Sequence, residues 1–197
     1  MYAEFDDVSL YYEVYGDGEP LILVHGLMVD AGFYENAAQL LKKHYKVITF
    51  DRRGNSRSTL KENASCSIEA QLGDIKNLMD LLEIESAYFV GASAGAILSM
   101  AFMLKYPDKV KHLIMYEPPI LHYVEGTSAI EWIAEMDDFI SRKKLNNALL
   151  SLSDRIASND NRGPKKPDEV AMRELRNIKH VLRVDFHIYL DYVPTVE

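Results

Sequence analysis

The chain has 197 residues, of which 48% are hydrophobic and 26% charged, enough for one buried core without disulfides or a structural metal. Its 22 basic and 30 acidic residues give a net charge of −8, which disfavours nucleic acid and anionic membranes as partners. No apolar run approaches the roughly 20 residues that a membrane-spanning helix needs. The single cysteine, Cys66, and an N-terminus without signal-peptide character favour a cytoplasmic location.

The first part of the chain, up to Pro119, alternates short apolar runs with longer segments of helical periodicity. This alternation is typical of an α/β fold built on a parallel sheet with helices on both faces. The segment Val8–Gly16 ends in a turn-prone sequence and predicts an antiparallel strand ahead of that sheet. Near-continuous apolar runs predict four strands that are covered on both faces, namely Pro20–His25, Lys46–Phe50, Ala87–Gly91 and Val110–Glu117.

Helices are predicted in the gaps between these strands. The segment Phe33–His44 carries Ala37, Leu40 and Leu41 at a spacing that places them on one apolar face. We therefore expect these three side chains to pack against the sheet. The same periodicity predicts two further helices, Ile68–Leu82 and Gly95–Lys105.

After residue 119 the character of the sequence changes. Strand-like runs disappear, and two amphipathic stretches follow, separated by the breaker-rich run 158–164. Ser128, three residues before Glu131, has the spacing of a helix-capping box. We interpret residues 1–119 as an α/β core and residues 120–197 as a helical cap.

The pentapeptide Gly91-Ala92-Ser93-Ala94-Gly95 lies between a predicted strand and a predicted helix. In that context a Gly-x-Ser-x-Gly pattern is a nucleophile elbow, a tight turn that projects the serine above the sheet. The glycines lack the Cβ atoms that would collide with neighbouring elements. The amide of Ala94 and the positive end of the following helix would face an oxyanion formed when Ser93 attacks an acyl carbon.

A second loop with a part in this chemistry follows an earlier strand. The run Leu21-Ile22-Leu23-Val24 ends in His25-Gly26, and both loops fall at the carboxyl ends of parallel strands. The amide of Leu27 is the candidate for the second oxyanion donor. We expect His25 to shape this loop through hydrogen bonds and not to act as a base.

Together, and in this order, the motifs resemble those of the α/β-hydrolase fold family. His25-Gly26 is similar to its oxyanion loop, residues 51–58 to its Asp-x-Arg-Gly-x-Gly-x-Ser loop, and residues 91–95 to its elbow. The helical stretch after residue 119 resembles its cap. The resemblance implies a serine hydrolase in which Ser93 attacks a small ester or similar acyl substrate through an acyl-enzyme, without a cofactor or metal. We expect Asp51 and Arg52 to hold their loop together as a charge pair.

A serine hydroxyl needs a histidine base and an orienting acid, which the family carries on two strands that follow the cap. The sequence shows no such strands. The candidates within the chain are Glu117 and His122, just past the last predicted strand, whereas His112 lies at the wrong end of that strand. His180 and His187 are expected on a cap helix. The alternative function is a truncated or degenerate hydrolase that serves as a ligand-binding module or is inactive.

The last predicted strand, Val110–Glu117, would form an apolar edge of the sheet. Exposed edges of this kind invite pairing with another chain. We expect the edge to be covered, either by the cap or by a second copy of the chain in a homodimer.

Overall fold

The computed structural model describes residues 1–120, 127–156, 169, 172–173, 177, 180–185 and 192. In chain order its elements are β1 (Tyr2–Glu4), β2 (Val8–Tyr15), β3 (Glu19–Val24), the 3₁₀ turn η1 (Ala31–Tyr34), α1 (Glu35–Leu41), β4 (Tyr45–Phe50), β5 (Thr59–Leu60), α2 (Ile68–Leu81), β6 (Ala87–Ala92), α3 (Ala94–Lys105), the 3₁₀ turn η2 (Pro107–Lys109), β7 (Val110–Tyr116), α4 (Thr127–Ser141), α5 (Leu145–Ile156) and the π-helical turn η4 (Val181–Asp185).

The centre of the molecule is a seven-stranded mixed sheet with the order β1-β2-β4-β3-β6-β7, in which β5 pairs with β2. Strands β4, β3, β6 and β7 run parallel to one another. Strand β2 is antiparallel to its neighbours β1, β4 and β5. The fold is therefore the α/β architecture that the sequence predicted, with an antiparallel strand ahead of the parallel part of the sheet. The bounds of the predicted strands differ from the observed ones by one or two residues.

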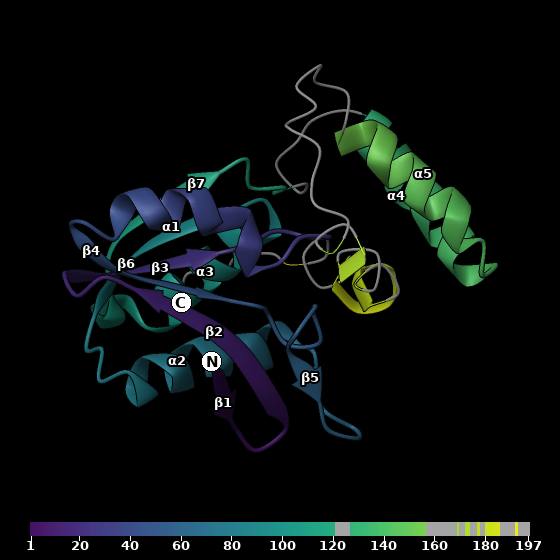
Figure 1. Ribbon diagram of the computed structural model, residues 1–197. Coiled ribbons are helices and arrows are strands. Elements are labelled where there is room, and N and C mark those ends of the chain that lie inside the picture. The colour runs from purple at the N-terminus through teal and green to yellow at the C-terminus, as the bar shows by residue number, and fades with distance from the viewer. Residues whose placement is uncertain are drawn as a thin grey trace.

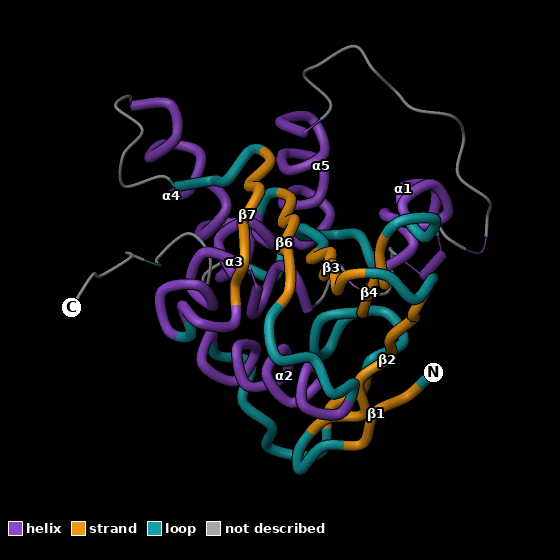
Figure 2. The backbone as a smooth tube through the Cα atoms, turned by 90° about the vertical axis from the view of Figure 1, so that its left-hand side faces the viewer, coloured by secondary structure: helices purple, strands orange, loops and turns teal. Residues whose placement is uncertain are grey.

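Helices cover the sheet on both faces. Helix α1 lies on one face, and α2 and α3 lie on the other (Figures 1 and 2). The larger core forms under α2 and α3, where Phe89 and Phe102 stack with ring centroids 5.2 Å apart. The smaller core forms under α1 around Ala38 and Val47.

The buried face of α1 differs from the predicted one. Leu40 is 70% exposed, whereas Tyr34 and Ala38 are buried and Leu41 packs beside them. These three positions follow the i, i+4, i+7 pattern of one helical face, so the apolar stripe lies about one residue away from the expected stripe. The expectation for Leu40 was wrong. Leu40 and Leu41 are identical residues one position apart, so the sequence pattern does not show which of them faces the sheet.

The first amphipathic stretch of the predicted cap forms two helices. Helices α4 and α5 lie side by side as a hairpin outside the sheet (Figure 1), with a turn in which Lys143 has a φ of 58°. Met136 and Ala148 are buried between them, and the indole Nε1–H of Trp132 donates to Ser151 Oγ at 3.1 Å. Leu27 and Met28 of the core pack against this cluster.

The described residues between 169 and 185, called the C-terminal segment below, contact the core. Arg173 bonds Asp30, and Asp185 bonds Arg52. Contacts with the core are therefore made both by α4 and α5 and by this later segment. The division of the chain into a core of residues 1–119 and a cap of residues 120–197 stays a prediction.

Strand β7 is the bare edge of the sheet. Ile114 is 62% exposed and Tyr116 60% exposed, so the described part of the cap does not cover them. Beside Ile114 lies an open apolar hollow of about 240 Å³, lined also by Tyr88 and His112. Of the two ways in which we expected this edge to be covered, the described part of the predicted cap does not provide one, and the second copy stays a prediction.

Candidate active site

Ser93 lies on the sharp turn between β6 and α3. Its backbone has φ 52° and ψ −123°, in the left-handed range that side chains disfavour. The turn is held by the Ser93 N–H, which donates to the carbonyl of Tyr116 in β7 at 2.8 Å. Although Ser93 precedes the helix, its hydroxyl makes no capping bond to it. A serine before a helix usually accepts a hydrogen bond from a backbone N–H of the first turn, and the Ser93 hydroxyl does not make this bond.

Two glycines make this turn sterically feasible. A Cβ on Gly91 would lie 2.4 Å from the carbonyl oxygen of Gly95, and a Cβ on Gly95 would lie 2.1 Å from the carbonyl oxygen of Val24. Both neighbours are backbone atoms, which cannot rotate away. The turn, the helix and β3 can approach one another this closely only without side chains at these two positions.

The loop after β3, His25–Met28, lies directly against the elbow. A Cβ on Gly26 would come within 3.1 Å of Ser93 Cβ and 3.7 Å of Ser93 Oγ. Leu27 follows Gly26 and packs both against the main core and against the cap helices. The two predicted oxyanion donors, the amides of Leu27 and Ala94, therefore belong to loops that meet at Ser93.

His25 fixes this loop from inside the protein. Its Nε2 accepts a hydrogen bond from the Arg52 N–H at 2.9 Å, so its proton resides on Nδ1, which is 2.8 Å from the Gly26 carbonyl oxygen. Burial, together with the charge of Arg52, lowers the pKa of His25 to about 4. The imidazole is neutral at pH 7 and both nitrogens are engaged. His25 is therefore a loop-shaping residue, as the sequence predicted.

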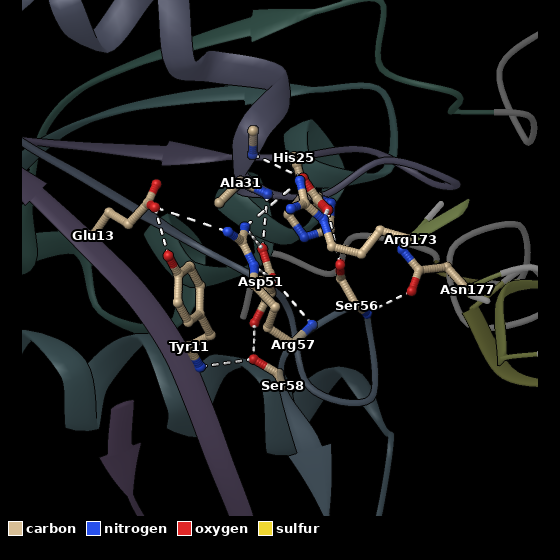
Figure 3. A network of polar contacts seen from close by, with 12 residues as sticks. Tyr11, Glu13, His25, Ala31, Asp51, Ser56, Arg57, Ser58, Arg173 and Asn177 are labelled. Carbon is tan, nitrogen blue, oxygen red and sulfur yellow. Dashed lines mark hydrogen bonds and ion pairs between the residues drawn. The ribbon is translucent and has the colours of Figure 1, made fainter. Parts of the chain in front are cut away.

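The loop of residues 51–58, the arginine loop, is built around Asp51 (Figure 3). This buried carboxylate accepts hydrogen bonds from the backbone N–H of Ala31 at 2.9 Å and from the Arg57 guanidinium at 2.7 and 2.8 Å. Ser56 Oγ donates to Asp30 Oδ2 at 2.8 Å, and Arg173 donates to the same oxygen at 2.7 Å. The expected charge pair between Asp51 and Arg52 was wrong: Arg57, six residues away, takes that place.

Arg52 points to the other side of its loop, into the protein. Its Nη2 donates both to Asp185 Oδ2 at 2.8 Å and to the Gly26 carbonyl oxygen at 3.2 Å, and its Nη1 donates to Gln71 Oε1 at 3.1 Å. Burial raises the pKa of Asp185, but Arg52, His180 and Asn55 outweigh it, and the pKa falls to about 2. The ion pair between Arg52 and Asp185 is therefore charged at neutral pH.

Asp185 is the site residue that the sequence analysis missed. It is separated from Arg52 by 133 residues, so no local spacing connects the two. The available signal was chemical: a carboxylate beside Val184, next to apolar positions, needs a cationic partner when the segment is buried.

The predicted base and acid are not brought together within the described residues. Glu117 is exposed and follows Tyr116, whose carbonyl accepts the Ser93 amide, but His122 lies outside the described residues. His187 also lies outside them. His112 stacks on Tyr88 with ring centroids 5.6 Å apart, at the opposite end of β7 from the elbow. His180 lies against Gly54, with Nε2 3.6 Å from Asp185 Oδ1.

The described residues contain neither a grouped set of metal ligands nor a membrane-spanning helix. In that part of the chain, no three or more His, Cys, Asp or Glu side chains are grouped as a metal site would require. Within the same residues, no helix is long and apolar enough to cross a membrane.

The chain has relatives of known family. It is 29% identical over 153 residues to the uncharacterized hydrolase YraK of Bacillus subtilis, and the matched region covers 77% of this chain and 56% of YraK. It is 32% identical over 112 residues to the putative carbamate hydrolase RutD of Azorhizobium caulinodans, and the matched region covers 57% of this chain and 42% of RutD. The chain thus spans about half the length of these curated relatives.

Solved structures show the same fold. A putative epoxide hydrolase from Pseudomonas aeruginosa superposes with a TM-score of 0.77 at 21% identity, covering 97% of this chain and 71% of the other. The sequence model of the alpha/beta hydrolase fold matches residues 19–159, which include the elbow and both neighbouring loops. With that match over most of its length, the chain belongs to the alpha/beta hydrolase fold family.

Proposed function

We propose that this site hydrolyses a small ester or a similar acyl substrate, with Ser93 as the nucleophile. The observation that carries the proposal is the backbone of Ser93, held at φ 52° on a strand-to-helix turn with its hydroxyl unused by the helix. Strained backbone conformations of this kind persist where the surrounding structure enforces them, and they cluster at functional sites. Attack of Ser93 Oγ on the acyl carbon would break the ester bond and release the alcohol, which takes up the proton lost by the serine, leaving an acyl-enzyme. Water then cleaves the acyl-enzyme to the free acid and restores the Ser93 hydroxyl.

The amides of Leu27 and Ala94 are proposed to stabilise the oxyanion. Ala94 N–H opens α3 and has no acceptor within the helix, so it can face a negative charge at the positive end of the helix. Leu27 belongs to the loop that lies against Ser93. Removal of one such donor typically costs about 100- to 1,000-fold in rate.

The cap helices supply the apolar side of the proposed substrate site. Trp132 and Phe139 belong to the same apolar cluster as Leu27, which follows the Gly26 that lies against Ser93. An apolar lining favours a small, weakly polar acyl group, since such pockets gain most of their affinity from buried apolar surface. Carbamate hydrolysis, named for RutD, is also attack on a carbonyl carbon, and carbamates belong to the substrates worth testing.

For the location of the protein, the single cysteine supports a cytoplasmic assignment.

The base that activates Ser93 has two proposed sources. One is His122, with Glu117 as its acid, and the other is a polypeptide segment beyond this chain, since the relatives are longer. The second candidate function is a ligand-binding module or an inactive fold, which would result if Ser93 has no base.

One observation favours this second function: in the described part of the chain, no histidine is bonded to Ser93 Oγ.

A covalent probe separates these two functions. The chain and its Ser93→Ala variant are incubated with a fluorophosphonate at neutral pH, and the adduct is located by intact mass and peptide mapping. Hydrolysis predicts labelling that is confined to Ser93 and absent from the variant. A folded wild-type chain that reacts no faster than free serine would support the binding module and reject the hydrolase.

A further inference from the structure

The carbonyl of Gly26 is held by two hydrogen-bond donors inside the protein. His25 Nδ1 approaches it at 2.8 Å, and Arg52 Nη2 donates to it at 3.2 Å. This carbonyl belongs to the same planar peptide group as the N–H of Leu27, and in a trans peptide the two bonds point in opposite directions. Fixing the Gly26 oxygen therefore fixes the direction of the Leu27 N–H.

The direction in which the Arg52 guanidinium points is set by Asp185 together with Gln71, which accepts from Nη1 at 3.1 Å. The two hydrogens of Nη2 lie in the plane of the guanidinium, roughly 120° apart. One is bonded to Asp185 Oδ2, which orients the plane, and the other then points at the Gly26 carbonyl. Both side chains are buried, with 0% of the Arg52 and 1% of the Asp185 side chain exposed, so water does not compete for either bond.

Asp185 is itself held in place from the arginine loop. Asn55 Nδ2 donates to Asp185 Oδ2 at 3.2 Å, and Asn177 of the same C-terminal segment accepts the N–H of Ser56. Figure 3 shows Asn177 reaching Ser56 from this segment. The segment is thus bonded to the loop at several points.

We propose that Asp185 is a positioning residue: acting through Arg52, it holds the Gly26 carbonyl and so directs the Leu27 N–H toward Ser93. The inference rests on the proposed function, because it assigns Leu27 as an oxyanion donor. It makes the C-terminal segment, far from Ser93 in sequence, a determinant of the oxyanion site. No bond is made or broken by Asp185 in this role.

The test needs a variant that removes the pair without leaving a buried charge. Asp185→Ala alone would strand the Arg52 cation inside the protein and unfold the chain, whereas replacing both partners by apolar residues is often tolerated. The variant is therefore the double substitution Arg52→Met with Asp185→Leu. Asp185→Asn also leaves the Arg52 charge without its counterion, but it keeps the shape of the side chain and an oxygen near Arg52, and it serves as the second variant. Arg173→Gln is the matched control, because it breaks the ion pair to Asp30 without touching Gly26.

Two readouts are measured on each folded chain: the rate of fluorophosphonate labelling at Ser93, and the amide resonance and hydrogen exchange of Leu27 by NMR. The double variant is expected to label about 100-fold more slowly, as after loss of one oxyanion donor, with a displaced Leu27 resonance. Asp185→Asn is expected to fall between it and the wild type, and Arg173→Gln to match the wild type. Wild-type labelling together with an unchanged Leu27 resonance in the folded double variant would overturn the proposal, as would the same result in Asp185→Asn if the double variant does not fold.

The NMR readout separates this proposal from the function on which it rests. If the wild-type chain is not labelled at all, the hydrolase function fails. The Leu27 resonance then still decides the positioning: displacement in the two Asp185 variants, but not in Arg173→Gln, supports it, and no displacement overturns it.

Discussion

The surroundings of β6 and of its neighbour β7 are built in opposite ways. At the carboxyl end, the elbow is enclosed by β3, α3 and the loop after β3, so closely that Gly95 has no room for a Cβ. Along the outer edge of the same sheet, Ile114 and Tyr116 of β7 are mostly exposed. The comparison shows that the turn at Ser93 is tightly enclosed by the chain's own backbone, while the sheet that carries this turn ends in an open apolar edge. The predictions below test each side of that contrast.

The largest effect is expected at Gly95. Gly95→Ala would place a Cβ 2.1 Å from the Val24 carbonyl oxygen and should lower the free energy of unfolding by about 5 kcal/mol or prevent folding. The control is Gly73→Ala in α2, where nothing lies within 4 Å, and a gain of roughly 0.5–1 kcal/mol is expected there from helix propensity. Urea denaturation measures both. A mild loss in Gly95→Ala would show that the elbow is less tightly enclosed than described.

The next effect compares neighbouring strands. Phe89 of β6 is 1% exposed in the main core, and Phe89→Ala should cost about 4 kcal/mol of unfolding free energy. Ile114 of β7 is mostly exposed in the single chain, and at concentrations too low for two copies to pair Ile114→Ala should change stability by less than about 0.5 kcal/mol. Both values come from the same denaturation series. A large loss in Ile114→Ala would mean that the edge is covered in solution.

A pH effect of intermediate size is expected from His25. Its pKa is about 4 in the folded protein, below the ordinary 6.5, because it is buried beside Arg52. Between pH 6.5 and 4 the unfolded chain binds a proton that the folded chain rejects, so the free energy of unfolding falls with falling pH, by about 3 kcal/mol over that window. Denaturation at several pH values measures the slope. His25→Asn should flatten it, and an unchanged slope in that variant would contradict the assignment.

The smallest effect on stability goes with a change of assembly. The homodimer through β7 stays a prediction; an antiparallel register centred on Ile114 would bring Lys111 opposite Glu117 of the second copy. Light scattering should then find dimers that Ile114→Lys converts to monomers of unchanged fold. A monodisperse wild-type monomer would reject a second copy as the cover of this edge.

How much the sequence predicts depends on the range of the interaction. Local patterns predicted five of the seven strands to within one or two residues and identified the turn at Ser93, because alternation, periodicity and glycine spacing are read within a few residues. They missed the short strands β1 and β5. They failed for Leu40, where neighbouring positions are equally apolar. They could not find the bond between Arg52 and Asp185, because a buried arginine requires a carboxylate but does not specify which one.

The most direct test of the proposed site is a crystal structure of the chain after reaction with the fluorophosphonate. The account predicts one adduct, on Ser93 Oγ, whose phosphonyl oxygen lies about 2.7–3.1 Å from the amide nitrogens of both Leu27 and Ala94. An adduct on another residue, or a phosphonyl oxygen that points away from both amides, would contradict the assignment of Ser93 and its two loops as a working hydrolytic centre.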